Sequence, residues 1–300
     1  MGNWPSIESM FVPHSTQSGP RRGSNPTSDH ELILERHNDA IVRSMHGNLI
    51  QSPVKSPRCI LDVGCNIGIL TSKLGNLFPA AQVYGVDLEL ANLRVTQGTP
   101  RNVNYIDGNI HNLALNKPFL PGSQDFILSR LVMCGMTDWE GYIEKAFEML
   151  KPGGYLELQE EDVDWLVDDE SITEDWEWLD VCYPSDALND FQCAKKAADR
   201  MERAGFVNVQ VKKFKWPWGD WMAKDGHTET FDIGQIFKLH CTSHCQDMLN
   251  GICSDAGYTK EKIRNLKAEC AETLETSEKK YKEFYVIWGR KPLDKDCSMN

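Results

Sequence analysis

One stretch of the chain, residues 59–68 (CILDVGCNIG), constrains its fold more than any other. It has the form of a buried strand followed by a glycine-bearing turn that opens a helix. Residues 83–87 form a second strand that ends in a carboxylate, at the distance one βαβ unit requires. Gly64 and Gly68 let the backbone approach a ligand closely, and Asp87 can accept hydrogen bonds from both hydroxyls of a ribose. The pattern therefore predicts a parallel α/β sheet that binds an adenosine at its carboxyl edge.

The rest of the chain alternates between strands and helices in the same way. This alternation predicts a Rossmann-like fold with a seven-stranded, mostly parallel sheet and helices on both faces. Its last strand is expected to run antiparallel. The expected strands are residues 59–63, 82–87, 103–106, 125–131, 155–159, 207–214 and 284–288. The expected helices before and between them are residues 29–48, 67–78, 90–97 and 138–150.

The domain organisation follows from the segments that do not fit this alternation. Residues 1–28 are rich in Ser, Pro and Gly and lack the apolar run of a signal peptide, so we expect a flexible tail. Residues 29–300 are expected to form a single domain. Helical insertions at about 173–205 and 219–280 would stand over the ligand edge of the sheet, as a lid with an acceptor pocket beneath it.

Composition excludes several classes of protein. No apolar run is long enough for a membrane helix, so we expect a soluble protein without a membrane partner. The net charge of −12 disfavours nucleic acid as a partner. The ten cysteines are irregularly spaced and follow no secretory signal, which favours reduced thiols and a cytoplasmic location.

Acidic residues are concentrated in residues 153–189, which contain no Lys or Arg. Such a run is most often a solvated face. The alternative is a field that attracts a cationic acceptor or a basic protein partner. Glu160, Glu161 and Asp162 follow the expected fifth strand, where they could bind an ammonium group or serve as a base, or simply face solvent.

Four spaced motifs together resemble those of the class I S-adenosylmethionine-dependent methyltransferases. Residues 61–68 resemble the first motif, Asp87 the acid that ends strand two, Asp107 the acid that meets adenine, and residues 150–154 the turn before strand five. Arg130, Asp138-Trp139 and the closing Gly-Arg-Lys-Pro of residues 289–292 are similar to fungal LaeA-like and TAM-type methyltransferases, which include tailoring enzymes of secondary metabolism.

This resemblance implies methyl transfer from S-adenosylmethionine to a small-molecule acceptor. It also implies that Asp62 faces the methionine amino group and that Ser129 and Arg130 lie under the sulfonium and carboxylate. Asn66 stands where the family has a glycine, and asparagine is among the few residues that tolerate the left-handed conformation. The implied cofactor residues are Asp62, Gly64, Cys65, Asn66, Gly68, Asp87, Leu88, Asp107, Gly108, Asn109, Ser129 and Arg130.

A general base is needed if the acceptor is a hydroxyl. His240 and His244 share a helical stripe with Ile233, Phe237 and Met248, so both are candidate bases, with hydrogen-bonded core histidines as the alternative. His and Cys neighbours on a helix point about 100° apart, so we predict no metal site there. Tryptophans cluster in or beside the insertions, which suits stacking on a planar or cationic acceptor or, alternatively, packing in the core.

Two other functions remain open beside the small-molecule methyltransferase. The chain could be a LaeA-like regulatory protein that binds the cofactor and acts through protein partners, using the acidic face. It could also be a methyltransferase fold recruited to a reaction that transfers no methyl group. The sequence predicts neither the methylated atom nor the oligomeric state.

Overall fold

A computed structural model of the protein describes residues 29–88, 90, 93, 98–113, 116–167, 170–171, 176–185, 187–275 and 279–293. The expected N-terminal tail, residues 1–28, and most of the expected helix at 90–97 lie outside the described residues.

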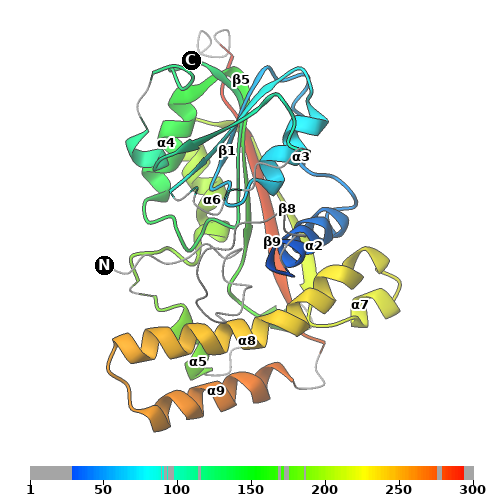
Figure 1. Ribbon diagram of the computed structural model, residues 1–300, viewed down its shortest axis with the longest axis vertical. Helices are drawn as coiled ribbons and strands as arrows, with labels where there is room; N and C mark the ends of the chain where they lie inside the picture. The colour runs from blue at the N-terminus through cyan, green and yellow to red at the C-terminus, as the bar shows by residue number, and fades with distance from the viewer. Residues whose placement is uncertain are drawn as a thin grey trace, which may run out of the picture.

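A single mixed sheet runs through the molecule (Figure 1). Its order is β3-β2-β1-β4-β5-β9-β6-β7, and β8 pairs with β9. Strands β1 to β5 are parallel, whereas β9 runs antiparallel to both β5 and β8, so the expected mixed topology with an antiparallel last strand is confirmed. The strands described are β1 (Cys59–Val63), β2 (Gln82–Asp87), β3 (Val103–Asp107), β4 (Gln124–Arg130), β5 (Leu150–Glu161), β6 (Leu166–Val167), β7 (Glu170–Ser171), β8 (Val207–Pro217) and β9 (Tyr281–Arg290). The seven expected strands are all present, and the two-residue strands β6 and β7 are additional.

Helices cover both faces of the sheet, as expected (Figure 1). Helix α3 packs on β2 and β3 with α2 beside it, and α4 and α6 pack on β5, β8 and β9 from the other face. The described helices are α2 (Asp29–Ser44), α3 (Ile69–Leu77), η2 (Ile110–Asn112), α4 (Trp139–Met149), α5 (Glu177–Cys182), α6 (Cys193–Arg203), α7 (Trp221–Lys224), η3 (Thr228–Thr230), α8 (Phe231–Asp255) and α9 (Lys260–Leu274).

The two insertions contribute to different parts of the molecule. Helices α5, α8 and α9 pack against one another and form a layer at the lower end of Figure 1, beyond the carboxyl ends of the parallel strands. We call this layer the cap. Helix α6 belongs to the first insertion in sequence, but it packs on the sheet through buried Ala194, Ala197 and Met201. Of residues 173–205, therefore, only the part around α5 joins the cap.

Strand β5 begins earlier than the sequence indicates. The Lys-Pro-Gly-Gly turn of residues 151–154 follows the end of helix α4, but Leu150 before it is already paired with Gln124 of β4. The N–H of Gly153 donates to the carbonyl of Lys291 at 2.9 Å, and the N–H of Lys291 donates to Gly154 at 2.8 Å. These bonds with a segment distant in sequence extend the strand, so its start could not be predicted from local turn residues.

Aromatic side chains join the cap and α2 to the sheet. Trp216 on β8 is fully buried and stacks on Phe284 of β9 with ring centroids 4.1 Å apart. Its ring also contacts Phe237 of α8 at 5.5 Å, and its Nε1–H donates to the hydroxyl of Ser44 on α2 at 2.9 Å. Trp165 and Trp218, 5.6 Å apart, continue this packing. Two of the tryptophans that could have stacked on an acceptor, Trp216 and Trp218, are therefore part of the core.

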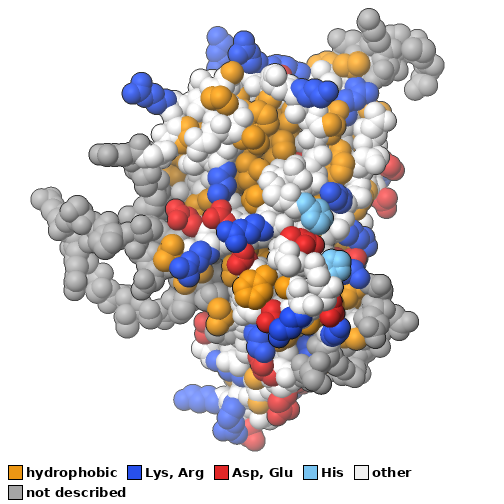
Figure 2. All heavy atoms as spheres, turned by 90° about the vertical axis from the view of Figure 1, so that its right-hand side faces the viewer, with side chains coloured by type: hydrophobic (Ala, Val, Ile, Leu, Met, Phe, Trp, Pro, Cys, Tyr) orange, Lys and Arg blue, Asp and Glu red, His pale blue; other side chains and the backbone are white. Residues whose placement is uncertain are grey.

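The surface seen in Figure 2 is the side that carries α2 and α3. Acidic and basic side chains alternate over it, and hydrophobic side chains gather in an elongated strip in its upper half. The net charge of −12 is therefore not concentrated on this face. In the part of the chain that the structure describes, no helix has both the length and the hydropathy required of a membrane span.

The central position of Trp216 makes it a test of this architecture. We expect Trp216→Ala to lower the free energy of unfolding by about 3–5 kcal/mol, because it removes a large ring from three packed elements. Ser44→Ala, which keeps the ring but removes the hydroxyl that accepts from the indole N–H and donates to the carbonyl of Ile41, should cost about 1 kcal/mol. Urea denaturation followed by circular dichroism measures both. If Trp216→Ala lowers the free energy of unfolding by no more than Ser44→Ala does, Trp216 does not have the central packing role described here.

Candidate functional site

The turn after β1 is fixed by backbone hydrogen bonds to β2. The N–H groups of Gly64 and Cys65 donate to the carbonyl of Val86 at 2.8 and 3.2 Å. The N–H of Asn66 donates to Oδ2 of Asp87 at 2.8 Å. Asn66 has a φ of 48°, in the left-handed region where asparagine was expected to replace glycine. The side chain of Asp87, at the end of β2, therefore stabilises the turn after β1.

Two glycines in this turn are required by both their conformation and their neighbours. Gly64 has a φ of 74°, and a Cβ atom there would lie 2.4 Å from Cγ1 of Val132. Gly68 has a φ of 87°, and a Cβ atom there would lie 2.4 Å from the hydroxyl of Tyr105. That hydroxyl donates to the carbonyl of Gly68 at 3.1 Å, which fastens the turn to β3. Any side chain at either position would displace the turn.

The register of the parallel strands brings three carboxylates to one edge of the sheet. Asp62 pairs with Gly85 in β2, and Asp87 pairs with Asp107 at the ends of β2 and β3. Because register partners of parallel strands point to the same face, and side chains alternate along a strand, these three acids share a face. The N–H of Gly108 donates to the carbonyl of Asp87 at 2.8 Å, which holds the end of β3 against β2.

Asp62 is a buried carboxylate with one oxygen in use. Its side chain is 1% exposed, and Oδ2 accepts a hydrogen bond from the hydroxyl of Thr71 at 2.6 Å. Oδ1 is buried without a hydrogen-bond partner. Burial raises the pKa of Asp62 to about 6, with the repulsion of Asp87 adding to it and Thr71 and Arg130 opposing it. A buried oxygen of this kind is suited to bind a donor from a ligand.

Arg130 and Ser129 end β4 on opposite faces of the sheet. The guanidinium of Arg130 is buried and donates to Gln159 at 2.6 Å, to Asn38 of α2 at 3.1 Å and to the carbonyl of Leu49 at 3.1 Å. It thus ties α2 and the following segment to the sheet and acts on Asp62 through its charge. Ser129 is fully buried, with its hydroxyl on the face of α4.

The other predicted cofactor residues surround the three acids. Cys65 is buried within the turn, and burial raises the pKa of its thiol. Leu88 is 60% exposed immediately after β2, where it can cover a ligand. Asn109 uses its side-chain oxygen to accept from the N–H of His111 at 2.9 Å and so begins the η2 turn. The structure therefore gathers the predicted residues along the ends of β1 to β4.

The candidate bases lie on the cap. His240 and His244 belong to α8, as predicted, but their side chains lie outside the described residues, so their role as bases stays a prediction. Among the side chains that the structure describes, no three His, Cys, Asp or Glu residues are grouped to hold a metal ion. Nine cysteines are free thiols within the same part of the chain.

The acidic run is not a solvated face in the second half of β5 and directly after it, so that interpretation is wrong for four of its residues. Glu157, Glu160, Glu161 and Asp162 are all buried. Glu157 accepts from the N–H of Ser52 at 2.6 Å, and Asp162 pairs with Lys195 at 2.8 Å. Glu161 lies 3.7 Å from the buried ammonium of Lys282. Their partners come from distant parts of the sequence, so these carboxylates stabilise internal cations and backbone donors.

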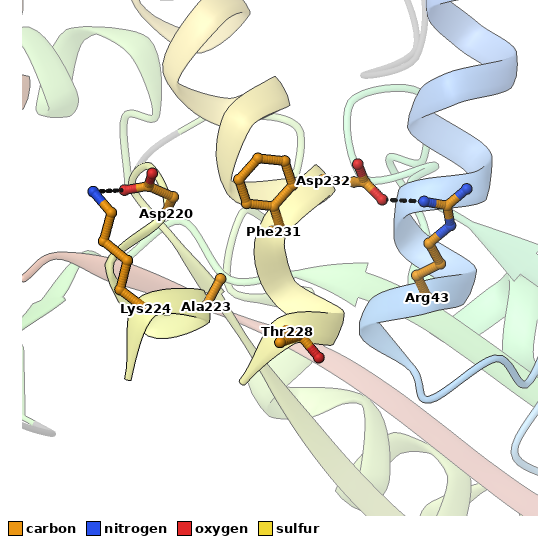
Figure 3. A pocket seen from close by; sticks show the side chains of 7 residues that line it. All are labelled: Arg43, Asp220, Ala223, Lys224, Thr228, Phe231 and Asp232. Carbon is orange, nitrogen blue, oxygen red and sulfur yellow. Dashed lines mark hydrogen bonds and ion pairs between the residues drawn. The ribbon is translucent and has the colours of Figure 1, made fainter. Parts of the chain in front are cut away.

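A separate pocket of about 560 Å³ lies between the end of α2 and the helices α7, η3 and α8 (Figure 3). Arg43 pairs with Asp232 across it, and Lys224 pairs with Asp220 at 2.9 Å. Its remaining lining residues are Ala223, Thr228 and Phe231. None of the predicted cofactor residues lines this pocket, so it is distinct from the edge that carries the three acids.

Sequence reasoning missed several residues that shape the site. Thr71 orients Asp62, Tyr105 fastens Gly68, and Val132 lies against Gly64. Thr71 lies in the first turn of α3, where a hydroxyl facing back toward β1 could have been anticipated. Tyr105 lies in β3 and Val132 follows β4. Nothing in the sequence distinguishes either residue from the other hydrophobic residues of the sheet.

Comparisons with known proteins agree with this geometry. A family described as a methyltransferase domain matches residues 39–211, more than half of the chain. Methyltransferase cpsF of Aspergillus campestris is 28% identical over 271 residues, covering 83% of this chain and 91% of that protein. The secondary metabolism regulator LAE1 of Cochliobolus heterostrophus is 29% identical over 210 residues, covering 65% of this chain and 64% of that protein.

Solved structures share the fold. The (4+2)-cyclase SpnF superposes with a TM-score of 0.50 and 15% identity, covering 90% of this chain and 85% of that one. An identity this low shows a common fold alone. Together with the strand order and the glycine turn, the family match establishes that the chain belongs to the methyltransferase domain family, in its class I, S-adenosylmethionine-dependent branch.

Proposed function

We propose that this protein transfers a methyl group from S-adenosylmethionine to a small-molecule acceptor of fungal secondary metabolism. The observation that carries the proposal is the juxtaposition of the Asn66 turn with Asp62, Asp87 and Asp107 at one edge of the sheet. The similarity to methyltransferase cpsF and to a secondary metabolism regulator supports the metabolic context.

The order of the strands sets the direction in which the cofactor lies. In this proposal Asp107, at the end of β3, binds the adenine amine, and Asp87, at the end of β2, binds the ribose hydroxyls. Asp62 on β1 offers its unpartnered Oδ1 to the ammonium of the methionine part. The methyl group then lies toward the ends of β1 and β4, near the loop that begins at Leu131.

The residues of the chain contribute mainly by positioning. When bound, the sulfonium of the cofactor supplies an electrophilic methyl group for in-line displacement. Holding an acceptor atom against that methyl carbon is worth up to about 7–11 kcal/mol in favourable cases. The cap helices α5 and α8 stand beyond the carboxyl edge, and in this proposal the acceptor binds on that side of the sheet. His240 or His244 on α8 would take the proton of a hydroxyl acceptor.

The proposal includes a cytoplasmic location, which the nine free thiols of the described residues support. A regulatory role through protein partners is the second candidate function. The similarity to the regulator LAE1 favours it, and it uses the same cofactor site.

Mass spectrometry of cells with and without the gene distinguishes the two functions. A small-molecule enzyme should produce metabolites that differ by one methyl group between the two cell lines, and purified protein should restore the heavier species with a deuterated methyl donor. Methyl transfer restricted to proteins would favour the regulatory role. Absence of any labelled product, with the cofactor bound, would contradict methyl transfer altogether.

Substitution of Asp87 tests the cofactor site. Asp87→Asn keeps a carbonyl oxygen for the N–H of Asn66 but removes the charge that the ribose hydroxyls would meet. We expect its affinity for S-adenosylhomocysteine to fall by about 10- to 100-fold, as for the loss of hydrogen bonds to a charged group. Isothermal titration calorimetry measures this. Asp39→Asn, on the exposed surface of α2, is the matched control, and equal affinities in the two variants would contradict the assignment.

Asp62 should destabilise the ligand-free protein at neutral pH. Its pKa rises from 3.8 to about 6 on folding, so burying the charged form costs up to about 3 kcal/mol above pH 6. The cost declines as the pH falls through the folded pKa and is absent below the unfolded pKa, where the carboxyl is protonated in both states. Asp62→Asn can still accept from Thr71 and avoids this cost.

We therefore expect Asp62→Asn to unfold at a higher temperature than the parent protein at pH 7.5, with the difference shrinking toward pH 4.5. Its affinity for S-adenosylhomocysteine should fall, since the ammonium loses a charged partner. Calorimetric melting at the two pH values measures the first effect, with Asp39→Asn as control. A lower melting temperature at pH 7.5 would contradict the assigned role of the buried charge.

A further inference from the structure

The loop between β4 and α4, residues 131–136, has a conformation that its own sequence does not favour. Leu131 has a φ of 53° and is 1% exposed, although leucine rarely occupies the left-handed region. Backbone outliers of this kind persist where the surroundings determine them, and they cluster at functional sites. Val132, Met133, Cys134 and Met136 are buried as well, so the loop is packed inside the molecule.

Two buried polar side chains hold this loop from opposite directions. Glu160, at the end of β5, accepts from the N–H of Val132 at 2.9 Å through Oε1 and from the N–H of Met133 at 3.3 Å through Oε2. Asn189 donates from Nδ2 to the carbonyls of Met133 at 3.2 Å and of Cys134 at 2.7 Å. We call these four hydrogen bonds the loop clamp. It satisfies polar backbone groups that would otherwise be buried unpaired.

The clamp determines where Val132 lies, and Val132 lies on the cofactor turn. Its Cγ1 atom occupies the space into which a Cβ atom on Gly64 would project. Gly64 follows β1, and β1 and β4 are neighbours in the sheet. In the proposed orientation of the cofactor this is the end that receives the methionine part and the methyl group, away from Asp87 and Asp107.

Asn189 is itself anchored through the residue that follows it. Asp190 pairs with Arg200 of α6 at 2.5 Å, and Arg200 pairs with Glu140 in the first turn of α4 at 2.7 Å. Asn189 lies in the connection between α5 of the cap and α6 of the sheet layer. The position of the loop is therefore linked both to the sheet, through Glu160, and to the segment that leads from the cap, through Asn189.

We propose that Glu160 and Asn189 are positioning residues for methyl transfer, which hold Val132 against the cofactor turn and so shape the methionine end of the cofactor site. Neither residue is one of the acids of β2 and β3 that the proposed function assigns to the nucleoside. The proposal rests on the proposed function. It adds that different residues act on different parts of the cofactor: the acids of β2 and β3 bind the nucleoside, and the loop clamp positions the backbone at the end where the methyl group is transferred.

Two ligands that differ in the amino-acid part test the proposal. Isothermal titration calorimetry compares S-adenosylhomocysteine with 5′-methylthioadenosine, which lacks that part, for the parent protein, Glu160→Gln, Asn189→Ala and Asp87→Asn. Glu160→Gln leaves one backbone N–H facing an amide N–H, and Asn189→Ala removes both donors. We expect each to bind S-adenosylhomocysteine about tenfold more weakly and 5′-methylthioadenosine within about twofold of the parent. Asp87→Asn should weaken both ligands alike.

The outcomes separate the possible failures. If the parent protein binds neither ligand, the proposed function fails and this inference with it. If the parent binds both, and the clamp variants weaken both equally or neither, the proposed function survives and the positioning role is overturned. Thermal unfolding of the same samples shows that the variants are folded. Should Glu160→Gln fail to fold, Asn189→Ala carries the test on its own.

Discussion

The parallel register of β1, β2 and β3 is the constraint on which the site depends. It places Asp62, Asp87 and Asp107 on one face, and it brings the carbonyl of Val86 to the N–H groups of Gly64 and Cys65. A shift of one residue in any of these pairings would turn a carboxylate to the opposite face of the sheet. The apolar interior of the sheet determines the register, so core packing and ligand chemistry are specified together.

Several carboxylates are buried near the carboxyl edge of this sheet. Glu157, Glu160, Glu161 and Asp162 are withdrawn from water in the second half of β5 or directly after it, and burial raises the pKa of Glu157, Glu161 and Asp162. Each of the four has a partner that the fold supplies, whereas Asp62 has an oxygen without one. Groups buried with complete sets of partners serve the structure, and an incomplete set marks the place left for a ligand.

The parts of the molecule that the sequence predicts well are those with local causes. The bounds of β1 and β2 are as predicted, because a mostly apolar stretch ends there at a glycine turn or an acid. Asn66 adopts the left-handed conformation expected of it, because its short polar side chain tolerates it. The parallel direction of β1 to β5 follows from the alternation of strands and helices along the chain.

The parts that escaped prediction have distant causes. The start of β5 depends on Gln124 and Lys291, the burial of Glu161 on Lys282, and the placement of Val132 on Glu160 and Asn189. A run of acidic residues predicts a solvent-exposed face, and only the cations and N–H groups that face it in the fold show that these side chains are buried. Half of the first insertion lies on the sheet for a similar reason, since the small side chains of α6 fit β5, β8 and β9.

The aromatic packing around Trp216 has a consequence for how such enzymes diversify. One continuous apolar core runs from the sheet through Trp216 and Phe237 into α8 and α9. The cap is therefore not a detachable module, and grafting one from a relative would expose or overfill the interior that both layers share. If the acceptor binds beneath the cap, as proposed, a change of acceptor range would come from point substitutions on the inner surface of the cap, made one at a time while the shared interior stays filled.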